Sequence, residues 1–335
     1  MPTLYVSHED GILGQRGDAL FYKKGRNGPG ETIPIHIVDG VVVMGKGSVS
    51  TPALHFIMEN DIPLHFIDSS GRYMGSLTSG RGRGYLVKKR QFDAAANGKT
   101  VAAIARSIAA GKLGNQLATL RRGVVRGHLH DNALRSACAG IKALVAALTG
   151  CDDLETIRGY EGHAAALYFS VFGRLLKKPW YFNGRNRRPP RDPINAMLSF
   201  GYTLLLAHVT SATVTAGLDP CVGFLHPEYR GRPSMALDLM EEYRSQVIDR
   251  LIISIANQML LKPENFSRVD NGGVFIDAEA RKNFIRQFSK RLDEEVCNEI
   301  TGEVSTFRNH IFASARRFAA SLRTGTEYLP FKASF

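Results

Sequence analysis

The chain has 335 residues, 44% of them hydrophobic, and its formal net charge is +12 at pH 7. The length suggests two or three domains or one large one, the apolar content excludes a disordered chain, and the basic excess favours a polyanionic partner such as nucleic acid. There is neither an apolar run of about 18 residues nor a basic start followed by an apolar stretch, so we expect a cytoplasmic protein without membrane contact.

Residues 1–85 are predicted to form a small β domain. Runs of β-branched and aromatic residues are typical of strands, and they occur at 3–6, 19–22, 33–38, 41–44, 64–67 and 73–77. A short helix over 53–58 is predicted between them, because Ser50 or Thr51 can cap its start and Pro52 suits its first turn.

Residues 86–335 are predicted to form a larger, mostly helical domain. Ala and Leu recur at helical spacing over 101–111, 132–148, 162–176, 194–216, 234–259, 278–293 and 305–322. One hairpin is expected at 267–276, where Asp-Asn-Gly-Gly separates two β-type runs. The predicted fold class is therefore α+β: a small N-terminal β-strand domain followed by a larger, mostly α-helical catalytic domain.

The segment 217–252 holds candidate metal ligands. His226 lies in a predicted loop, and Asp238 and Glu241 follow on the next helix. Because these two acids are three residues apart, they lie on one helix face. Glu161, near the start of the predicted helix over 162–176, can supply a further carboxylate. An imidazole and carboxylates that converge in this way can hold a divalent cation.

The types of ligand narrow the choice of metal. Two or three carboxylates with one imidazole suit Mg²⁺ or Mn²⁺, and the four cysteines form no CxxC pair that would indicate a zinc site. Each residue also has a simpler interpretation: Glu161 as a helix-dipole partner, Glu241 as an ion pair with Arg244, and His226 as a structural histidine. Spacing alone leaves both interpretations open.

The segment 173–202 is dense in cations. Six fall within fifteen residues: Lys177, Lys178, Arg185, Arg187, Arg188 and Arg191. Cations beside aromatic rings can bind phosphates and stack on unpaired bases, so we predict that these six cations bind DNA, the arginines through its phosphates. Trp180, Tyr181 and Phe182 lie among them and either stack on bases or anchor the loop to the core.

A second basic patch lies at the junction of the two predicted domains. It contains Arg81 and Arg83, which we also predict to bind DNA, together with Lys88, Lys89 and Arg90. A third patch comprises Arg121, Arg122 and Arg126. Either of these patches can also be a solvated surface.

Three blocks of sequence resemble the family of CRISPR-associated protein one, the integrase and endonuclease of the spacer-acquisition complex. The blocks are YEGHAAALYF around Glu161, RRPPRDPINAMLSFGY at 187–202 and the stretch 217–244. The resemblance implies that Glu161, His226 and Glu241 are the metal ligands, although some members have aspartate at the position of Glu241. It makes Asp238 a helper close to the site or an alternative ligand.

The resemblance also implies partners and a reaction. The partners are double-stranded DNA, a second copy of the chain joined largely through the β domains, and the small CRISPR-associated protein two. The reaction is phosphodiester transesterification, in which the 3′-hydroxyl of a captured DNA fragment attacks the edge of a CRISPR repeat. Two alternatives are a non-catalytic DNA-binding scaffold and a small-molecule metallohydrolase, which would not need the cations at 185–191.

Overall fold

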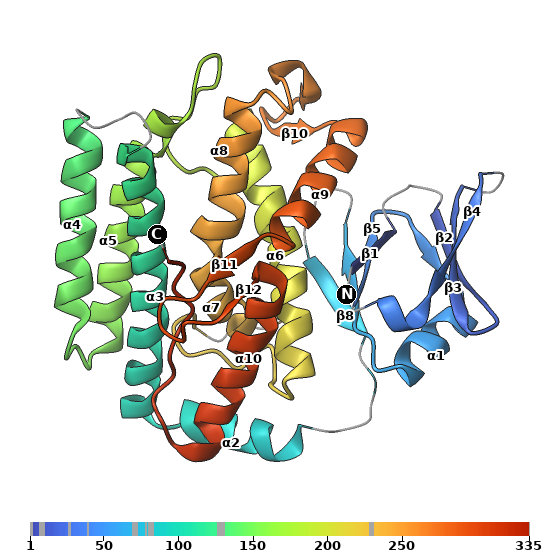
Figure 1. Ribbon diagram of the computed structural model, residues 1–335, viewed down its shortest axis with the longest axis horizontal. Coiled ribbons are helices and arrows are strands. Elements are labelled where there is room, and N and C mark those ends of the chain that lie inside the picture. Colours follow the sequence, from blue (N-terminus) through green and yellow to red (C-terminus); the bar gives the residue numbers. More distant parts are fainter. Residues whose placement is uncertain are drawn as a thin grey trace.

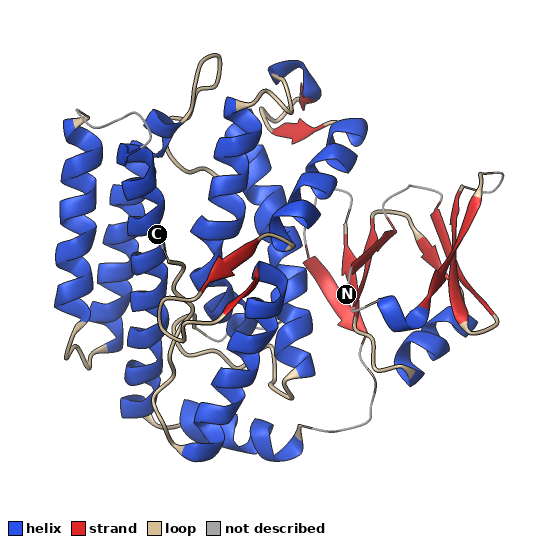
Figure 2. Ribbon diagram, viewed as in Figure 1, coloured by secondary structure: helices blue, strands red, loops and turns tan. Residues whose placement is uncertain are grey.

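In the computed structural model, a strand-rich N-terminal part lies beside a larger body of helices (Figure 1), and Figure 2 shows the same division by secondary structure. The structure describes residues 3–6, 11–25, 28–38, 40–68, 73–77, 79, 84–125, 131–227 and 231–334. Strands followed by a mostly helical remainder confirm the α+β class. The division of the chain into two domains at residue 85 stays a prediction; the first helix of the helical body begins there, at Tyr85.

The strands form two four-stranded sheets. One has the order β1 (Thr3–Val6), β5 (Gly40–Met44), β7 (Leu64–Ile67) and β8 (Tyr73–Leu77). Its first three strands are parallel and β8 is antiparallel to β7. The other has the order β4 (Gly30–Pro34), β3 (Ala19–Lys24), β2 (Gly11–Arg16) and β6 (Ser48–Val49). Here β2 and β3 form an antiparallel hairpin, and β6 is parallel to β2.

The strand predictions in this part of the chain need three corrections. Strand β6, which has only two residues, was not predicted. Strand β2 was not predicted, because Gly11 and Gly14 weaken the β signal of its sequence. The strand expected over 33–38 is wrong beyond Pro34, where β4 ends and the 3₁₀ turn η1 (Ile35–Ile37) follows. Helix α1 (Thr51–Glu59), which follows β6 along the chain, begins as predicted, with Ser50 Oγ accepting a hydrogen bond from the Ala53 amide.

The helical body begins with α2 (Tyr85–Ala95), which was not predicted, and α3 (Gly98–Val125), which is much longer than the predicted 101–111. The remaining long helices are α4 (Asn132–Leu148), α5 (Leu154–Phe172), α6 (Pro193–Thr215), α9 (Ala278–Leu292) and α10 (Phe307–Thr324). Short 3₁₀ turns are η2 (Gly173–Leu175) and η4 (Pro263–Asn265). Helices α3, α4 and α5 pack side by side (Figure 1).

Two small hairpins complete the body. The predicted one is confirmed as β9 (Phe266–Arg268) and β10 (Val274–Ile276). The other, β11 (Glu295–Cys297) with β12 (Val304–Thr306), was not predicted. Its strands have three residues each, which is too short for period-two alternation to be visible in the sequence.

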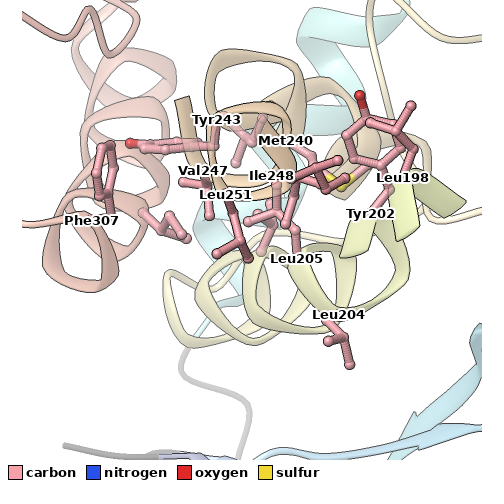
Figure 3. Packing of buried hydrophobic residues seen from close by; sticks show 14 of the residues in the cluster. Leu198, Tyr202, Leu204, Leu205, Met240, Tyr243, Val247, Ile248, Leu251 and Phe307 are labelled. Carbon is pink, nitrogen blue, oxygen red and sulfur yellow. The ribbon is translucent and has the colours of Figure 1, made fainter. Parts of the chain in front are cut away.

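The helix predicted over 234–259 is divided into three segments. It consists of α7 (Ser234–Tyr243), the π-helical segment η3 (Arg244–Asp249) and α8 (Arg250–Asn257). Figure 3 shows part of the core between this run and α6, in which Ile248 and Leu205 are buried. Segments of π-helix are frequent at functional sites, and here one directly follows the helix that carries Asp238 and Glu241.

Two apolar clusters stabilise the fold. The smaller lies within the N-terminal part, while the larger spans the helical body and includes Val42, Met44 and Ile67 from β5 and β7. In the described part of the chain, one helix, α6, has the length and composition of a membrane span, but 72% of its 18-residue window is buried inside the protein. It is therefore explained as the central core helix.

Candidate metal centre

Asp238 anchors the loop that precedes its helix. Its fully buried carboxylate accepts hydrogen bonds from the amides of Phe224 (2.6 Å), Leu225 (3.0 Å) and His226 (2.9 Å). It also lies 2.8 Å from His226 Nδ1. Because a carboxylate only accepts hydrogen bonds, Nδ1 carries a proton, so Nε2 is the nitrogen on which this ring can offer a lone pair. These bonds favour a positioning role for Asp238 over that of an alternative ligand.

Glu241 lies one helical turn further along α7 and is 4% exposed. Its Oε1 is 2.8 Å from Arg244 Nε and 3.7 Å from His226 Nε2, and its Oε2 is 2.6 Å from Lys112 Nζ. Burial by itself would raise the pKa of Glu241, but Arg244, Lys112 and His226 outweigh burial and hold this pKa well below its usual range. The carboxylate is therefore ionised at neutral pH.

Lys112 joins Glu241 to Glu161. Its ammonium, on α3, contacts Glu161 Oε1 on α5 as well as Glu241 Oε2 on α7. Burial would lower the pKa of Lys112, but the two carboxylates together raise it. The sequence did not identify this lysine, because a lone cation within a long helix carries no motif.

Arg158 connects the helix of Glu161 to the loop of His226. Its Nε donates to the Leu225 carbonyl at 2.8 Å, and its guanidinium also pairs with Glu155. The next residue along the loop is His226. Two distant parts of the chain thus meet here: α5, and the loop before α7 together with α7 itself.

The donors suit a divalent cation. Within the described ranges, no three carboxylate, imidazole or thiolate groups already form a metal cage, and the Lys112 ammonium contacts both Glu161 and Glu241. Glu241 Oε2 is buried without an aligned hydrogen bond, although the ammonium is close to it. Two carboxylates and a neutral imidazole nitrogen form a donor set that Mg²⁺ and Mn²⁺ accept.

A large cavity lies next to this cluster. Its volume is about 1190 Å³, and its lining includes Arg185, Arg187, Arg188 and Arg244. Arg244 links the cavity to the cluster, because it lines the cavity and also contacts Glu241. Its cationic wall suits a phosphate backbone.

The predicted DNA-binding cations differ in how exposed they are. Arg187, Arg188, Arg191, Lys177 and Lys178 are exposed. Arg185 is partly buried, with Nη1 donating to Asn195 Oδ1 at 2.7 Å and Nη2 to Ser199 Oγ at 3.1 Å. Burial lowers the pKa of Arg185 to about 10, so the guanidinium stays charged at neutral pH. These bonds give Arg185 a role in holding the loop, and its contact with DNA stays a prediction.

The aromatic residues of the loop divide between the two predicted roles. Trp180 is 5% exposed and its Nε1 donates to the Ala256 carbonyl at 2.9 Å. The ring of Phe182 packs edge-on against Phe172, with 5.2 Å between centroids. Tyr181 is 76% exposed. Trp180 and Phe182 therefore anchor the loop, while the position of Tyr181 leaves it free to stack on a base.

The other basic patches are described only in part. Arg81 and Arg83 lie outside the described residues, as does Arg126. Lys88, Lys89 and Arg90 are exposed on α2. The DNA contacts predicted for Arg81 and Arg83 stay predictions.

Comparison with known proteins identifies relatives over nearly the whole chain. The sequence model of the family described as CRISPR associated protein Cas1 matches residues 4–290. The chain is 35% identical to the CRISPR-associated endonuclease Cas1 2 of Rhodospirillum rubrum, covering 98% of this chain and 97% of the relative. It is 37% identical to the CRISPR-associated endonuclease Cas1 1 of Thermus thermophilus, covering 98% of both chains.

A solved structure shows the same fold. A chain of a Cas6-RT-Cas1–Cas2 complex matches with a TM-score of 0.84 and 25% identity, covering 99% of this chain and 36% of that longer chain. The match to the full length of this chain includes the strand-rich part as well as the helical body.

Proposed function

This chain belongs to the Cas1 family of CRISPR-associated proteins, and we propose that Glu161, His226 and Glu241 are the metal ligands of its active site. The chain is a metal-dependent DNA endonuclease and integrase that inserts captured DNA fragments into a CRISPR array. The observation that carries the site is the convergence of α5, the loop before α7, and α7 on the Lys112 ammonium and Glu241.

Each residue has a distinct role in this proposal. His226 offers the Nε2 lone pair, and Asp238 holds the ring by its Nδ1 proton while fixing the loop through three amides. Glu161 and Glu241 offer carboxylate oxygens. Held by these residues, Mg²⁺ or Mn²⁺ would supply Lewis-acid chemistry at the phosphoryl group that is cut or joined. If water is the nucleophile in place of a DNA 3′-hydroxyl, the same site cleaves DNA.

The surrounding cations are proposed to hold the DNA. Arg187 and Arg188 line the cavity that Arg244, the partner of Glu241, also lines, and Arg191, Lys177 and Lys178 extend the basic surface. A protein that neutralises six to ten phosphates loses roughly 10³ to 10⁵ in affinity between 50 and 200 mM salt. Phosphate contacts of this kind hold DNA without reading its sequence, so choice of the repeat requires base or shape readout.

The proposed partners follow from the family. They are double-stranded DNA, as captured fragment and as CRISPR repeat, a second copy of this chain, and Cas2, which is named in the matching Cas6-RT-Cas1–Cas2 complex.

The test is integration of a labelled duplex into a plasmid that carries a CRISPR repeat, with Mn²⁺, Mg²⁺ or a chelator. Glu161→Ala should abolish joining and cleavage while DNA binding persists, because the basic surface is unchanged. Glu303→Ala, which removes an exposed carboxylate far along the chain, is the matched control. Joining by Glu161→Ala at the wild-type rate would contradict the proposed ligand set and leave a DNA-binding scaffold as the simpler function.

Charge reversal tests the proposed DNA surface. Reversing Arg187, Arg188 and Arg191 together should weaken DNA binding and reduce its dependence on salt. Reversal of three exposed cations elsewhere, Lys142, Lys282 and Arg323, is the control for net charge. Equal loss in both variants would mean that overall charge, and not this loop, binds the DNA.

A further inference from the structure

Among the described residues, Lys112 is the one cation that contacts the carboxylates of both Glu161 and Glu241. Its ammonium reaches Glu161 Oε1, and it lies 2.6 Å from Glu241 Oε2. The Lys112 side chain is only 10% exposed, so the contacts are made away from bulk water. A divalent cation that bound both carboxylates would have to compete with this ammonium for the same oxygens.

The charges at the cluster show why this competition matters. Two cations, Lys112 and Arg244, face three carboxylates in this cluster: Glu161, Glu241 and the buried Asp238 beside His226. Addition of a divalent cation with the ammonium still in place would turn the net charge from −1 to +1 in a largely buried site, which is costly until an anionic phosphate arrives. Removal of the ammonium from between the carboxylates relieves that excess.

A purely structural lysine would behave differently. A counter-ion that only neutralises buried acids stabilises the folded chain, and its removal leaves an uncompensated charge. Arg244 already performs that task at Glu241 Oε1, through a 2.8 Å contact. Lys112 instead bridges two helices, α5 and α7, and contacts one oxygen on each.

We propose that Lys112 is a resident counter-ion of the metal centre, which holds Glu161 and Glu241 together in the metal-free protein and is displaced when the metal binds. The proposal rests on the proposed function, because it requires both acids to be metal ligands. It makes Lys112 a positioning residue that also sets the metal affinity: the ammonium keeps the ligands close together but competes with the ion they bind.

The experiment measures Mn²⁺ binding to the full-length protein by titration calorimetry, with thermal unfolding of the metal-free protein in parallel. Lys112→Met keeps much of the length of the side chain and removes the charge. It should bind Mn²⁺ about tenfold more tightly or better, because a buried competing charge is gone, and its metal-free form should melt at a lower temperature. Lys112→Arg keeps the charge and should not bind Mn²⁺ more tightly. Lys142→Met, on the exposed face of α4, is the surface control.

The outcomes separate this inference from the proposed function. If Glu161→Gln weakens Mn²⁺ binding but Lys112→Met binds it no more tightly than the wild type, the ligand set stands and the role of Lys112 is refuted. If Glu161→Gln binds Mn²⁺ as the wild type does, the ligand set is wrong and the inference falls with it. Should Lys112→Met fail to fold, Lys112→Gln keeps a hydrogen-bond donor without charge, and unchanged Mn²⁺ affinity in that variant would overturn the inference equally.

Discussion

Replacement of Asp238 by asparagine tests whether this residue acts through His226 and its loop. The side chain keeps its shape but loses its charge and one acceptor atom. Four donors reach the carboxylate: the amides of Phe224, Leu225 and His226, and the Nδ1–H of His226. An asparagine oxygen has two acceptor positions, so two of the four donors lose their partner.

The magnitude follows from that count. A buried donor left without an acceptor costs about 1–3 kcal/mol. With the amide oxygen facing His226, the Phe224 and Leu225 amides lose their acceptor, and the free energy of unfolding should fall by about 2–6 kcal/mol. With the NH₂ facing His226 instead, it donates to Nδ1, the ring proton moves to Nε2 and blocks the lone pair, and the His226 amide alone loses its acceptor, so the fall should be about 1–3 kcal/mol. Loss of such a carboxylate–histidine pair typically lowers metal affinity or activity by about 10–100-fold.

The assay combines urea unfolding with Mn²⁺ titration and integration of labelled DNA. Glu303→Gln makes the same chemical change at an exposed site and serves as the control. If Asp238→Asn folds and binds Mn²⁺ with wild-type affinity, Asp238 does not set the tautomer of His226. If the free energy of unfolding of Asp238→Asn is also unchanged, the hydrogen bonds that Asp238 accepts do not stabilise the loop.

Two further predictions concern the contact between sheet and helices, and the basic loop. His65 on β7 is hydrogen-bonded to Ser211 on α6, and burial lowers the pKa of His65 to about 4. The imidazole therefore binds a proton more tightly in the unfolded chain than in the folded one. Acidification from about pH 6.5 to 4 should lower the free energy of unfolding by up to about 3 kcal/mol. His65→Gln should show a shallower loss in urea unfolding at pH 7 and pH 5, and equal pH dependence of the two proteins would contradict this. In the loop, Trp180→Ala should destabilise the fold by about 3–5 kcal/mol, because the indole is buried and bonded to Ala256. Tyr181→Ala should leave thermal unfolding unchanged and weaken single-stranded DNA binding by about 1–3 kcal/mol if the exposed ring stacks on a base. If Tyr181→Ala destabilises the fold and Trp180→Ala weakens DNA binding alone, the roles given to the two rings are wrong.

The local sequence determined much of the secondary structure. Helix α4 has the predicted bounds of residues 132–148, and the hairpin of β9 and β10 lies where Asp-Asn-Gly-Gly predicted it. Helical periodicity and turn residues act over a few positions, so a single sequence is enough to detect them. The same dependence on short segments explains the strands that were not predicted. Glycines weaken the β signal of β2, and β11 and β12 are too short to show an alternating pattern.

The candidate ligands were proposed from the sequence, by residue type and by resemblance to a family, but only the tertiary structure decided what surrounds them. Lys112 lies on a helix that packs against both α5 and α7, and no spacing along the chain indicates that its ammonium meets Glu161 and Glu241. Likewise, the amides that bind Asp238 come from a loop whose path depends on the packing of α7. Contacts between distant segments depend on how whole helices pack, and that information is spread over the many residues of the core rather than held in any one motif.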